Sequence, residues 1–134
     1  MTGRILIVDD EQGLTDVLSE LLDLAGYETV VCHDAESARG ALADGSFDVA
    51  MLDVFLSNEP VGLDLASEIL AAHPETGVVL VTGYADKADI CAACLAGAYT
   101  CIGKPFTLEH VLKAIDAVIG DRHPTPAAVC GGVR

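Results

Sequence analysis

The chain has 134 residues, with 21 aspartates and glutamates against 7 lysines and arginines, which gives a formal net charge of −14 at pH 7. This balance excludes passive binding of nucleic acid, because that function needs clustered cations and here no two cations are adjacent. A hydrophobic content of 51% also excludes a disordered acidic tail, so we expect one compact domain.

The amino terminus does not resemble a secretory signal. Only four apolar residues, Ile5–Val8, precede two aspartates, and no apolar run approaches the roughly 20 residues of a membrane span. The five cysteines are an odd number without the spacing of a disulfide framework, which suits a reducing compartment. We therefore expect a cytoplasmic protein without a membrane partner.

Short apolar runs alternate with helical patterns along the chain. The runs are Ile5–Val8, Thr29–Cys32, Val49–Leu52, Val78–Val81 and Tyr99–Ile102. Three of them are apolar at every position, which is typical of strands that are covered on both faces. The spacing therefore predicts five strands.

Between and after these runs, apolar residues recur every three or four positions, as on one face of an amphipathic helix. The five stripes begin at Leu14, Ala38, Ala66, Cys91 and Leu108. Candidate N-caps are Asp34, Asp86 and Thr107, and the glycines near helix ends are Gly26, Gly45, Gly97 and Gly120. The pattern predicts five strand–helix units and hence an α/β fold with a doubly wound parallel sheet.

Such sheets bind ligands beyond the carboxyl ends of their strands. The polar residues that end or follow the apolar runs are Asp9 and Asp10, Asp53, Thr82 and Lys104. Because these strand ends share one edge of a parallel sheet, the sequence predicts three carboxylates, a hydroxyl and an ammonium group in one crevice.

Three neighbouring carboxylates need a cationic partner, because each pair at about 4 Å repels by roughly 4 kcal/mol at an effective dielectric near 20. Lys104 supplies one positive charge, and a hard divalent ion, for which Mg²⁺ is the favoured candidate, would supply the rest. A carboxylate in such a site can act as the nucleophile toward a phosphoryl group, whose oxygens the cations neutralise.

The sequence resembles the receiver domain of a two-component response regulator, in the family that includes the chemotaxis receivers. The resemblance runs from about Arg4 to Gly120 and rests on an ordered set of motifs: Ile5–Glu11, Asp53, Val81–Gly83, Gly97–Ala98 and Lys104–Phe106. It implies a flavodoxin-like (βα)5 fold with strand order 2-1-3-4-5 and a receiver domain over residues 1–120. Residues 121–134 contain two prolines and two glycines without a helical stripe, so we expect a flexible tail or linker there.

The resemblance also implies a role for each candidate residue. Asp53 would be the phosphoacceptor, and Asp9, Asp10 and the carbonyl of Phe55 would hold Mg²⁺ together with it. Thr82 would hydrogen-bond the new phosphate, and Lys104 would pair with it. The domain would catalyse only its own phosphorylation and dephosphorylation.

The partners implied by the resemblance are proteins. A sensor histidine kinase or a histidine phosphotransfer protein would donate the phosphoryl group in a phosphorelay. A downstream protein would bind the face formed by the fourth helix, the fifth strand and the fifth helix, and a homodimer is left open.

The sequence departs from the family pattern at two places. Cys101 stands where receivers usually carry a tyrosine or phenylalanine that switches together with the threonine. In the loop after Asp53, Gly62 comes one place later than usual. Phe55 and Tyr84 occupy the positions that flank the approach to the acyl phosphate, so we expect them to obstruct the attacking water and prolong the phosphorylated state.

Other classes fit the residues less well. One alternative is a degenerate receiver that acts as a phosphorylation-independent docking module. Cys101 favours this alternative, but the presence of all the polar residues expected at the strand ends opposes it: Asp9, Asp10, Asp53, Thr82 and Lys104. A haloacid-dehalogenase-type phosphatase would need a second acid at Phe55, and an FMN-binding flavodoxin would need a phosphate-cradling loop where Asp9 and Asp10 stand. Cys91 and Cys94 form a CxxC pair, but they lie on an apolar helix stripe, which predicts core residues rather than a redox or zinc site.

Overall fold

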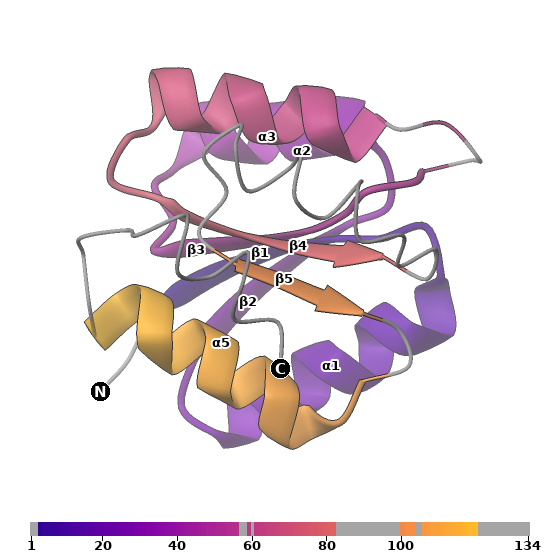
Figure 1. Ribbon diagram of the computed structural model, residues 1–134, viewed down its shortest axis with the longest axis vertical. Helices are drawn as coiled ribbons and strands as arrows, with labels where there is room; N and C mark the ends of the chain where they lie inside the picture. Colours follow the sequence, from indigo (N-terminus) through magenta and orange to yellow (C-terminus); the bar gives the residue numbers. More distant parts are fainter. Residues whose placement is uncertain (1–2, 57–58, 60, 83–99, 104–105, 121–134) are drawn as a thin grey trace.

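The computed structural model describes residues 3–56, 59, 61–82, 100–103 and 106–120 (Figure 1). The predicted fourth helix with Cys91 and Cys94, the tail after Gly120, and the candidate residues Tyr84 and Lys104 lie outside these ranges.

Five parallel strands form one sheet in the order β2-β1-β3-β4-β5. The strands are β1 (Arg4–Val8), β2 (Glu28–Cys32), β3 (Val49–Asp53), β4 (Gly77–Thr82) and β5 (Thr100–Gly103). Each predicted apolar run therefore coincides with a strand to within one residue at either end. The predicted parallel sheet and its strand order are confirmed.

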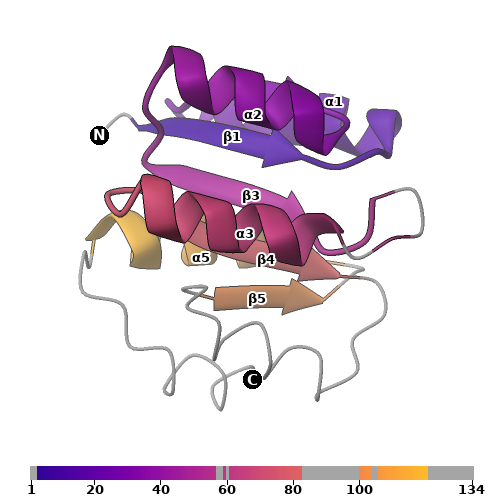
Figure 2. The same ribbon diagram turned by 90° about the horizontal axis from the view of Figure 1, so that it is seen from above.

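Helices cover both faces of the sheet (Figures 1 and 2). The described helices are α1 (Gln12–Leu24), α2 (Ala35–Asp44), α3 (Val61–Ala72) and α5 (Leu108–Gly120). Helices α1 and α5 lie on one face, and α2 and α3 lie on the other. The helices thus cover the sheet on both faces in a doubly wound arrangement.

Side-chain alternation along the strands divides the core into two layers. The layer against α1 and α5 takes Ile5, Ile7, Val49, Met51, Val79, Val81 and Ile102. The layer against α2 and α3 takes Leu6, Val8, Ala50, Leu52, Val78, Leu80 and Cys101. The strands β1, β3 and β4 are thus buried on both faces, as their uninterrupted apolar runs predict.

Asp34, Thr107 and Gly26 begin or end helices as the sequence predicts, while the candidates Asp86 and Gly97 lie outside the described residues. The carboxylate of Asp34 accepts a hydrogen bond from the Ser37 N–H at 2.7 Å and caps α2. Thr107 caps α5, since its Oγ1 accepts from the His110 N–H at 3.2 Å. Gly26 follows α1 with a φ of 102°, a left-handed conformation that a glycine adopts without strain, and so terminates the helix.

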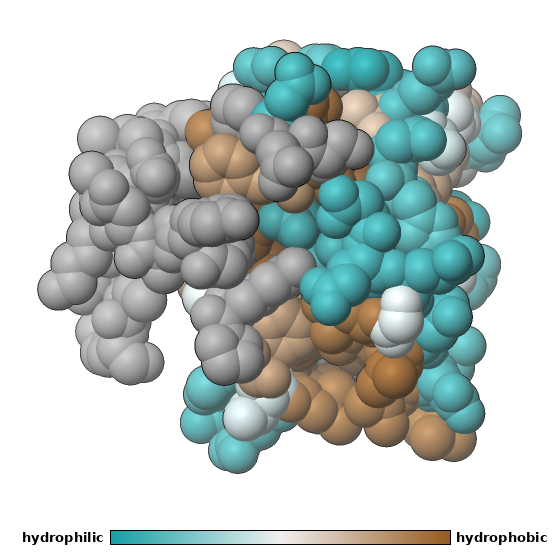
Figure 3. Space-filling model, turned by 90° about the vertical axis from the view of Figure 1, so that its right-hand side faces the viewer, coloured by the Kyte–Doolittle hydropathy of each residue, from teal (hydrophilic) through white to brown (hydrophobic). Residues whose placement is uncertain are grey.

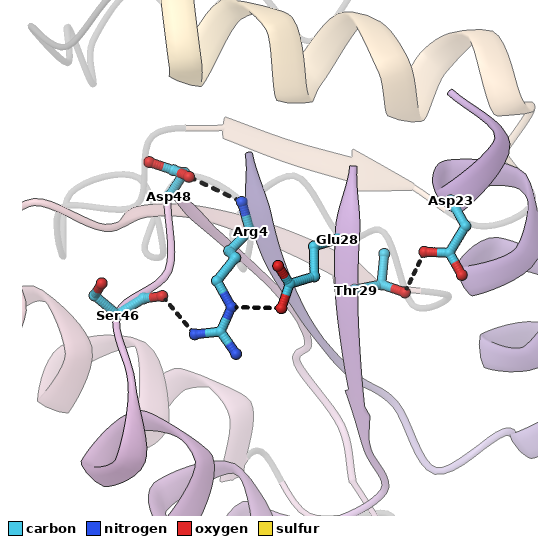
Figure 4. Close-up of polar contacts among 6 residues, drawn as sticks. All are labelled: Arg4, Asp23, Glu28, Thr29, Ser46 and Asp48. Atoms are coloured by element: carbon cyan, nitrogen blue, oxygen red, sulfur yellow. Dashed lines mark hydrogen bonds and ion pairs between the residues drawn. The ribbon is translucent and has the colours of Figure 1, made fainter. Parts of the chain in front are cut away.

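At the amino ends of the strands, Arg4 joins three segments of the chain (Figure 4). Its Nε lies 3.0 Å from Glu28 Oε2, and its Nη1 donates to the carbonyl of Ser46 at 3.0 Å. Its backbone N–H donates to Asp48 Oδ2 at 2.8 Å, and its guanidinium lies 4.6 Å from the ring centroid of Phe47. This end of the sheet is therefore cross-linked by polar contacts.

None of the helices within the described ranges has the length and apolar character that crossing a bilayer requires.

Candidate functional site

The structure brings together the three carboxylates that the sequence analysis placed in one crevice. Val8 and Leu52 are partners in the β1–β3 ladder, so Asp9 and Asp53 come next to each other at the carboxyl edge of the sheet. Asp10 follows directly. One carboxylate oxygen from each of the three residues lies within 4.8 Å of the other two.

Asp9 and Asp53 are oriented by the backbone that follows them. Asp9 Oδ1 accepts a hydrogen bond from the Glu11 N–H at 2.9 Å, and Asp53 Oδ1 accepts one from the Phe55 N–H at 3.1 Å. Both bonds join a side chain to the amide two residues later, which is the geometry of an Asx turn. Asp9 and Asp53 are 4% and 7% exposed, whereas Asp10 is exposed, so the cluster has a buried base and an open side.

The connection from β3 to α3 is held close to the site by main-chain hydrogen bonds. The Val54 N–H donates to the carbonyl of Val81 at 2.8 Å, which ties the start of the connection to β4. Leu56 and Glu59 then form an antiparallel bridge, with N–H to carbonyl distances of 2.9 and 3.1 Å. The Gly62 N–H donates back to the carbonyl of Val54 at 3.0 Å, so the connection closes on itself directly after Asp53.

The other candidate residues are placed to different extents. Thr82 ends β4 and is paired with Gly103 in the β4–β5 ladder, but its side chain lies outside the description. Lys104 follows β5 in the chain and is also outside the described residues. Phe55 is half-buried, and its side chain packs against the core layer of α2 and α3.

The carboxyl edge of the sheet faces the viewer in Figure 3, which looks from the side toward which the strand arrows of Figure 1 point. Hydrophilic residues cover the centre of this face, and a hydrophobic area lies below them on the side of α1 and α5. The site therefore opens onto a polar surface.

The donor set fits a hard divalent cation. Ca²⁺ and Mg²⁺ take oxygen ligands, and Mg²⁺ is typically bound by one or two carboxylates together with waters and phosphate oxygens. Asp9, Asp10 and Asp53 offer one carboxylate oxygen each from two adjacent strand ends, within the reach of a single ion. Mutual repulsion among three carboxylates at this separation also favours a bound cation.

Sequence reasoning missed Thr15 and His33, which lie beside the site. Thr15 is fully buried in the first turn of α1, and its Oγ1 lies 3.1 Å from His33 Nε2. His33 follows Cys32, whose carbonyl accepts the Asp9 N–H at 3.1 Å. The one sequence signal for Thr15 is its helical spacing to Leu18 and Leu22, which places it on the buried face of α1.

The described cysteines show no sign of a nucleophile. Cys32 and Cys101 are both buried, and neither forms a disulfide bond. Burial raises the pKa of the Cys32 thiol, and the negative charge of Asp34 raises it further. A thiol that resists ionisation is a poor nucleophile and metal ligand, so Cys32 serves packing.

Comparison with protein families gives one match that spans most of the chain. The model of the response regulator receiver domain matches residues 5–116.

Individual relatives agree with this match. The transcriptional regulatory protein CpxR of Klebsiella pneumoniae is 35% identical over 121 residues, which are 90% of this chain and 51% of that protein. The nitrogen assimilation regulatory protein NtrX of Azorhizobium caulinodans is 33% identical over 113 residues, which are 84% of this chain and 25% of that protein. The chain thus spans about half the length of CpxR and about a quarter of the length of NtrX.

Two of the similar solved structures match over nearly their full length. The receiver domain of NtrX from Brucella abortus has a TM-score of 0.80 at 33% identity, with 87% of this chain and 98% of that chain covered. A response regulator from Thermotoga maritima has a TM-score of 0.82 at 26% identity, with 90% and 100% covered. The flavodoxin-like arrangement that the sequence predicts is therefore shared with known receiver structures.

Proposed function

The chain belongs to the response regulator receiver domain family of two-component signalling, and from that membership we propose that Asp53 accepts a phosphoryl group and so switches partner binding in a phosphorelay. The observation that carries the proposal is the convergence of Asp9, Asp10 and Asp53 at the carboxyl edge of the sheet, with carboxylate oxygens within 4.8 Å of one another. The docking-module alternative is not favoured, because it has no use for such a cluster.

In the proposed reaction, a carboxylate oxygen of Asp53 forms a bond to the phosphorus of a phosphohistidine. The phosphorus–nitrogen bond breaks at the same centre, and the imidazole of the donor leaves with the electron pair. Asp53 is held for this step by the Phe55 N–H on Oδ1, and its 7% exposure keeps most water away.

Asp9, Asp10, Asp53 and the carbonyl of Phe55 are the residues that we propose to hold Mg²⁺. When bound, Mg²⁺ would neutralise the negative charge of the phosphoryl oxygens near the carboxylates. We assign the contact with the phosphoryl oxygens to Thr82 and Lys104, on the basis of their positions at the ends of β4 and β5 in the chain.

The proposed donor is a sensor histidine kinase or a histidine phosphotransfer protein, since receiver domains act with such proteins. The proposed output surface contains β5 and α5, together with the segment between β4 and β5. The relatives CpxR and NtrX are named as regulatory proteins, but the net charge of −14 argues against contact of this chain with DNA. A cytoplasmic location is consistent with the buried Cys32 and Cys101, neither of which forms a disulfide bond.

The test is the intact mass of the protein after incubation with acetyl phosphate, with and without Mg²⁺. We expect one Mg²⁺-dependent phosphoryl adduct on the wild type and none on Asp53→Asn. The matched control is Asp64→Asn, which removes an exposed carboxylate of α3 outside the cluster and should leave the adduct in place. A wild-type chain that takes no adduct would contradict the proposal and support a docking module.

A further inference from the structure

Helix α3 is packed onto the main chain of Asp53 at a single glycine. Gly62, the second residue of α3, is buried. A Cβ atom on Gly62 would overlap the carbonyl oxygen of Asp53 and would lie 2.8 Å from Val54 Cα and 2.9 Å from the carbonyl carbon of Asp53. Non-bonded carbon atoms are best separated by about 3.5–4.0 Å, so this contact has no room for a side chain.

The atoms that Gly62 meets belong to the backbone, which cannot move aside by a change of rotamer. In contrast, a Cβ on Gly40 of α2 would meet nothing within 4 Å. A Cβ on Gly77, at the amino end of β4, would overlap the side chain of Val118 rather than main-chain atoms. A methyl group at position 62 must therefore displace either α3 or the peptide after Asp53.

That peptide lies between two of the proposed metal-holding groups, the Asp53 carboxylate and the Phe55 carbonyl. The Val54 N–H of that peptide donates to the carbonyl of Val81 at 2.8 Å, and the Val54 carbonyl, in the next peptide, accepts from the Gly62 N–H at 3.0 Å. The Asp53 carboxylate in turn depends on the Phe55 N–H at 3.1 Å. A shift of the Val54 peptide consequently moves both groups relative to Asp9 and Asp10.

We propose that Gly62 is a positioning residue for the site: its missing side chain lets α3 hold the Asp53–Phe55 segment where the Asp53 carboxylate meets those of Asp9 and Asp10. This inference rests on the proposed function of Asp53, but the binding of Mg²⁺ tests it independently of phosphoryl transfer.

The test compares Gly62→Ala with the wild type for Mg²⁺ affinity by calorimetric titration, at a temperature where circular dichroism shows both to be folded. Loss of a group that orients metal ligands typically weakens metal binding by about 10–100-fold, and we expect a decrease in this range. The rate of phosphorylation by acetyl phosphate should fall together with the affinity. A folded Gly62→Ala protein with wild-type affinity and rate would overturn the proposal.

Two glycine controls separate positioning from stability. Gly77→Ala introduces a steric overlap at the opposite end of the sheet, so it should lower the midpoint of thermal unfolding without changing Mg²⁺ affinity. Gly40→Ala adds a methyl group in open space and should change neither property for the worse. Equal losses of affinity in Gly62→Ala and Gly77→Ala would show that affinity follows stability alone and would contradict the proposal.

A second measurement uses the wild type and applies even if Gly62→Ala does not fold. If the contact positions the metal ligands, then bound Mg²⁺ must stabilise the contact by the same coupling. Saturating Mg²⁺ should therefore slow hydrogen exchange of the Gly62 N–H, which donates to Val54, more than that of the Gly77 N–H, which donates to Asp48 at 3.0 Å. Unchanged exchange at Gly62 in a chain that binds Mg²⁺ would overturn the role of Gly62.

The outcomes for the two proposals are distinct. A wild-type chain that binds Mg²⁺ but takes no phosphoryl group contradicts the proposed function, while the metal titration still decides the role of Gly62. A chain that binds no Mg²⁺ contradicts both.

Discussion

Thr15 and His33 join the first turn of α1 to the end of β2 through a contact of 3.1 Å between Thr15 Oγ1 and His33 Nε2. The same hydroxyl donates to the carbonyl of Gln12 at 3.0 Å. Because a hydroxyl has one proton to give, the proton in the contact with the imidazole belongs to His33 Nε2. The buried Thr15 is thus the acceptor that fixes the ring of His33, which directly follows the last residue of β2, Cys32.

We predict that Thr15→Val lowers the free energy of unfolding by about 1–3 kcal/mol, because it leaves the Nε2–H of His33 without its acceptor in a half-buried position. Urea denaturation measures this difference. Thr15→Ser keeps the hydroxyl and should retain more of the stability than Thr15→Val. A Thr15→Val variant as stable as the wild type would contradict this role of the hydroxyl.

Removal of one carboxylate from the cluster should raise the stability of the metal-free protein and reduce the stabilisation that Mg²⁺ provides. Asp10→Asn relieves repulsion, so we predict a gain of about 1 kcal/mol in stability without Mg²⁺; the value is reduced from the Coulomb estimate because Asp10 is exposed. The increase in thermal midpoint on adding Mg²⁺ should be smaller than in the wild type. Asp16→Asn removes an exposed carboxylate of α1 outside the cluster and is the control. A full Mg²⁺ response in Asp10→Asn would show that Asp10 is not a ligand.

The aromatic ring of Phe55 provides a test of the lifetime of the phosphorylated state. We predict that Phe55→Asn releases phosphate several-fold faster than the wild type, because a smaller polar side chain lets water approach Asp53. Phe55 is half-buried against the α2/α3 core layer, so Phe55→Leu, which keeps an apolar contact there, reports the effect of lost packing. A release rate in Phe55→Asn no higher than in the wild type would contradict obstruction by the ring.

The fold follows from the sequence because its signals are local and mutually consistent. Ile5–Val8 is apolar at every position and becomes the doubly covered strand β1. Once the sheet is parallel, the convergence of Asp9 and Asp53 is a matter of register, since each follows one member of the Val8–Leu52 pair. The carboxylate cluster was therefore predictable from topology alone.

Other parts of the site depend on distances that no periodicity encodes. The contact of Thr15 with His33 arises from the packing of α1 against β2. The spacing of residues along the chain does not show which side chains of these two elements meet. The need for glycine at position 62 depends on the path of the loop after Asp53, which the Leu56–Glu59 bridge shapes. In the sequence, Gly62 is visible only as a shift from the family pattern.

A further prediction concerns alkaline pH. Burial raises the pKa of the Tyr27 hydroxyl, and the hydrogen bond that it donates to Asp116 Oδ1 at 2.9 Å raises it further, together with the charge of Asp116. A raised pKa in the folded state stabilises the protein below the unfolded value near 10, and this contribution is lost as the pH rises through the folded value. Tyr27→Phe should therefore lose about 0.5–1 kcal/mol at neutral pH, and its stability should depend less on pH above 10.

The measurement is the free energy of unfolding in urea between neutral pH and pH values above that of free tyrosine. Asp116→Asn is the control, because it keeps an acceptor for Tyr27 while removing the negative charge. A wild type and a Tyr27→Phe variant with parallel pH profiles would contradict the coupling.

Two arginines with different surroundings should differ in their contribution to stability. Arg4 has a carboxylate, a main-chain carbonyl and an aromatic ring around its guanidinium, so we predict that Arg4→Met costs about 1–2 kcal/mol. Arg39 contacts Glu68 through two bonds of 2.8 and 2.7 Å, but both side chains are half-exposed, so Arg39→Met should cost less. Urea denaturation at low and high salt compares them; a larger loss in Arg39→Met would contradict this ranking.

The cross-linked amino ends of the strands and the carboxylate cluster lie one strand length apart. With 5 residues in β1 at about 3.3 Å each, the separation is roughly 16 Å, about twice the screening length of physiological salt. Exposed charges added or removed near Ser46 and Glu28 consequently have very little effect on the electrostatic energy of an ion bound at the carboxylate cluster. Surface recharging for crystallisation, immobilisation or fusion to another protein can therefore be confined to the amino edge, where it leaves ion affinity unchanged.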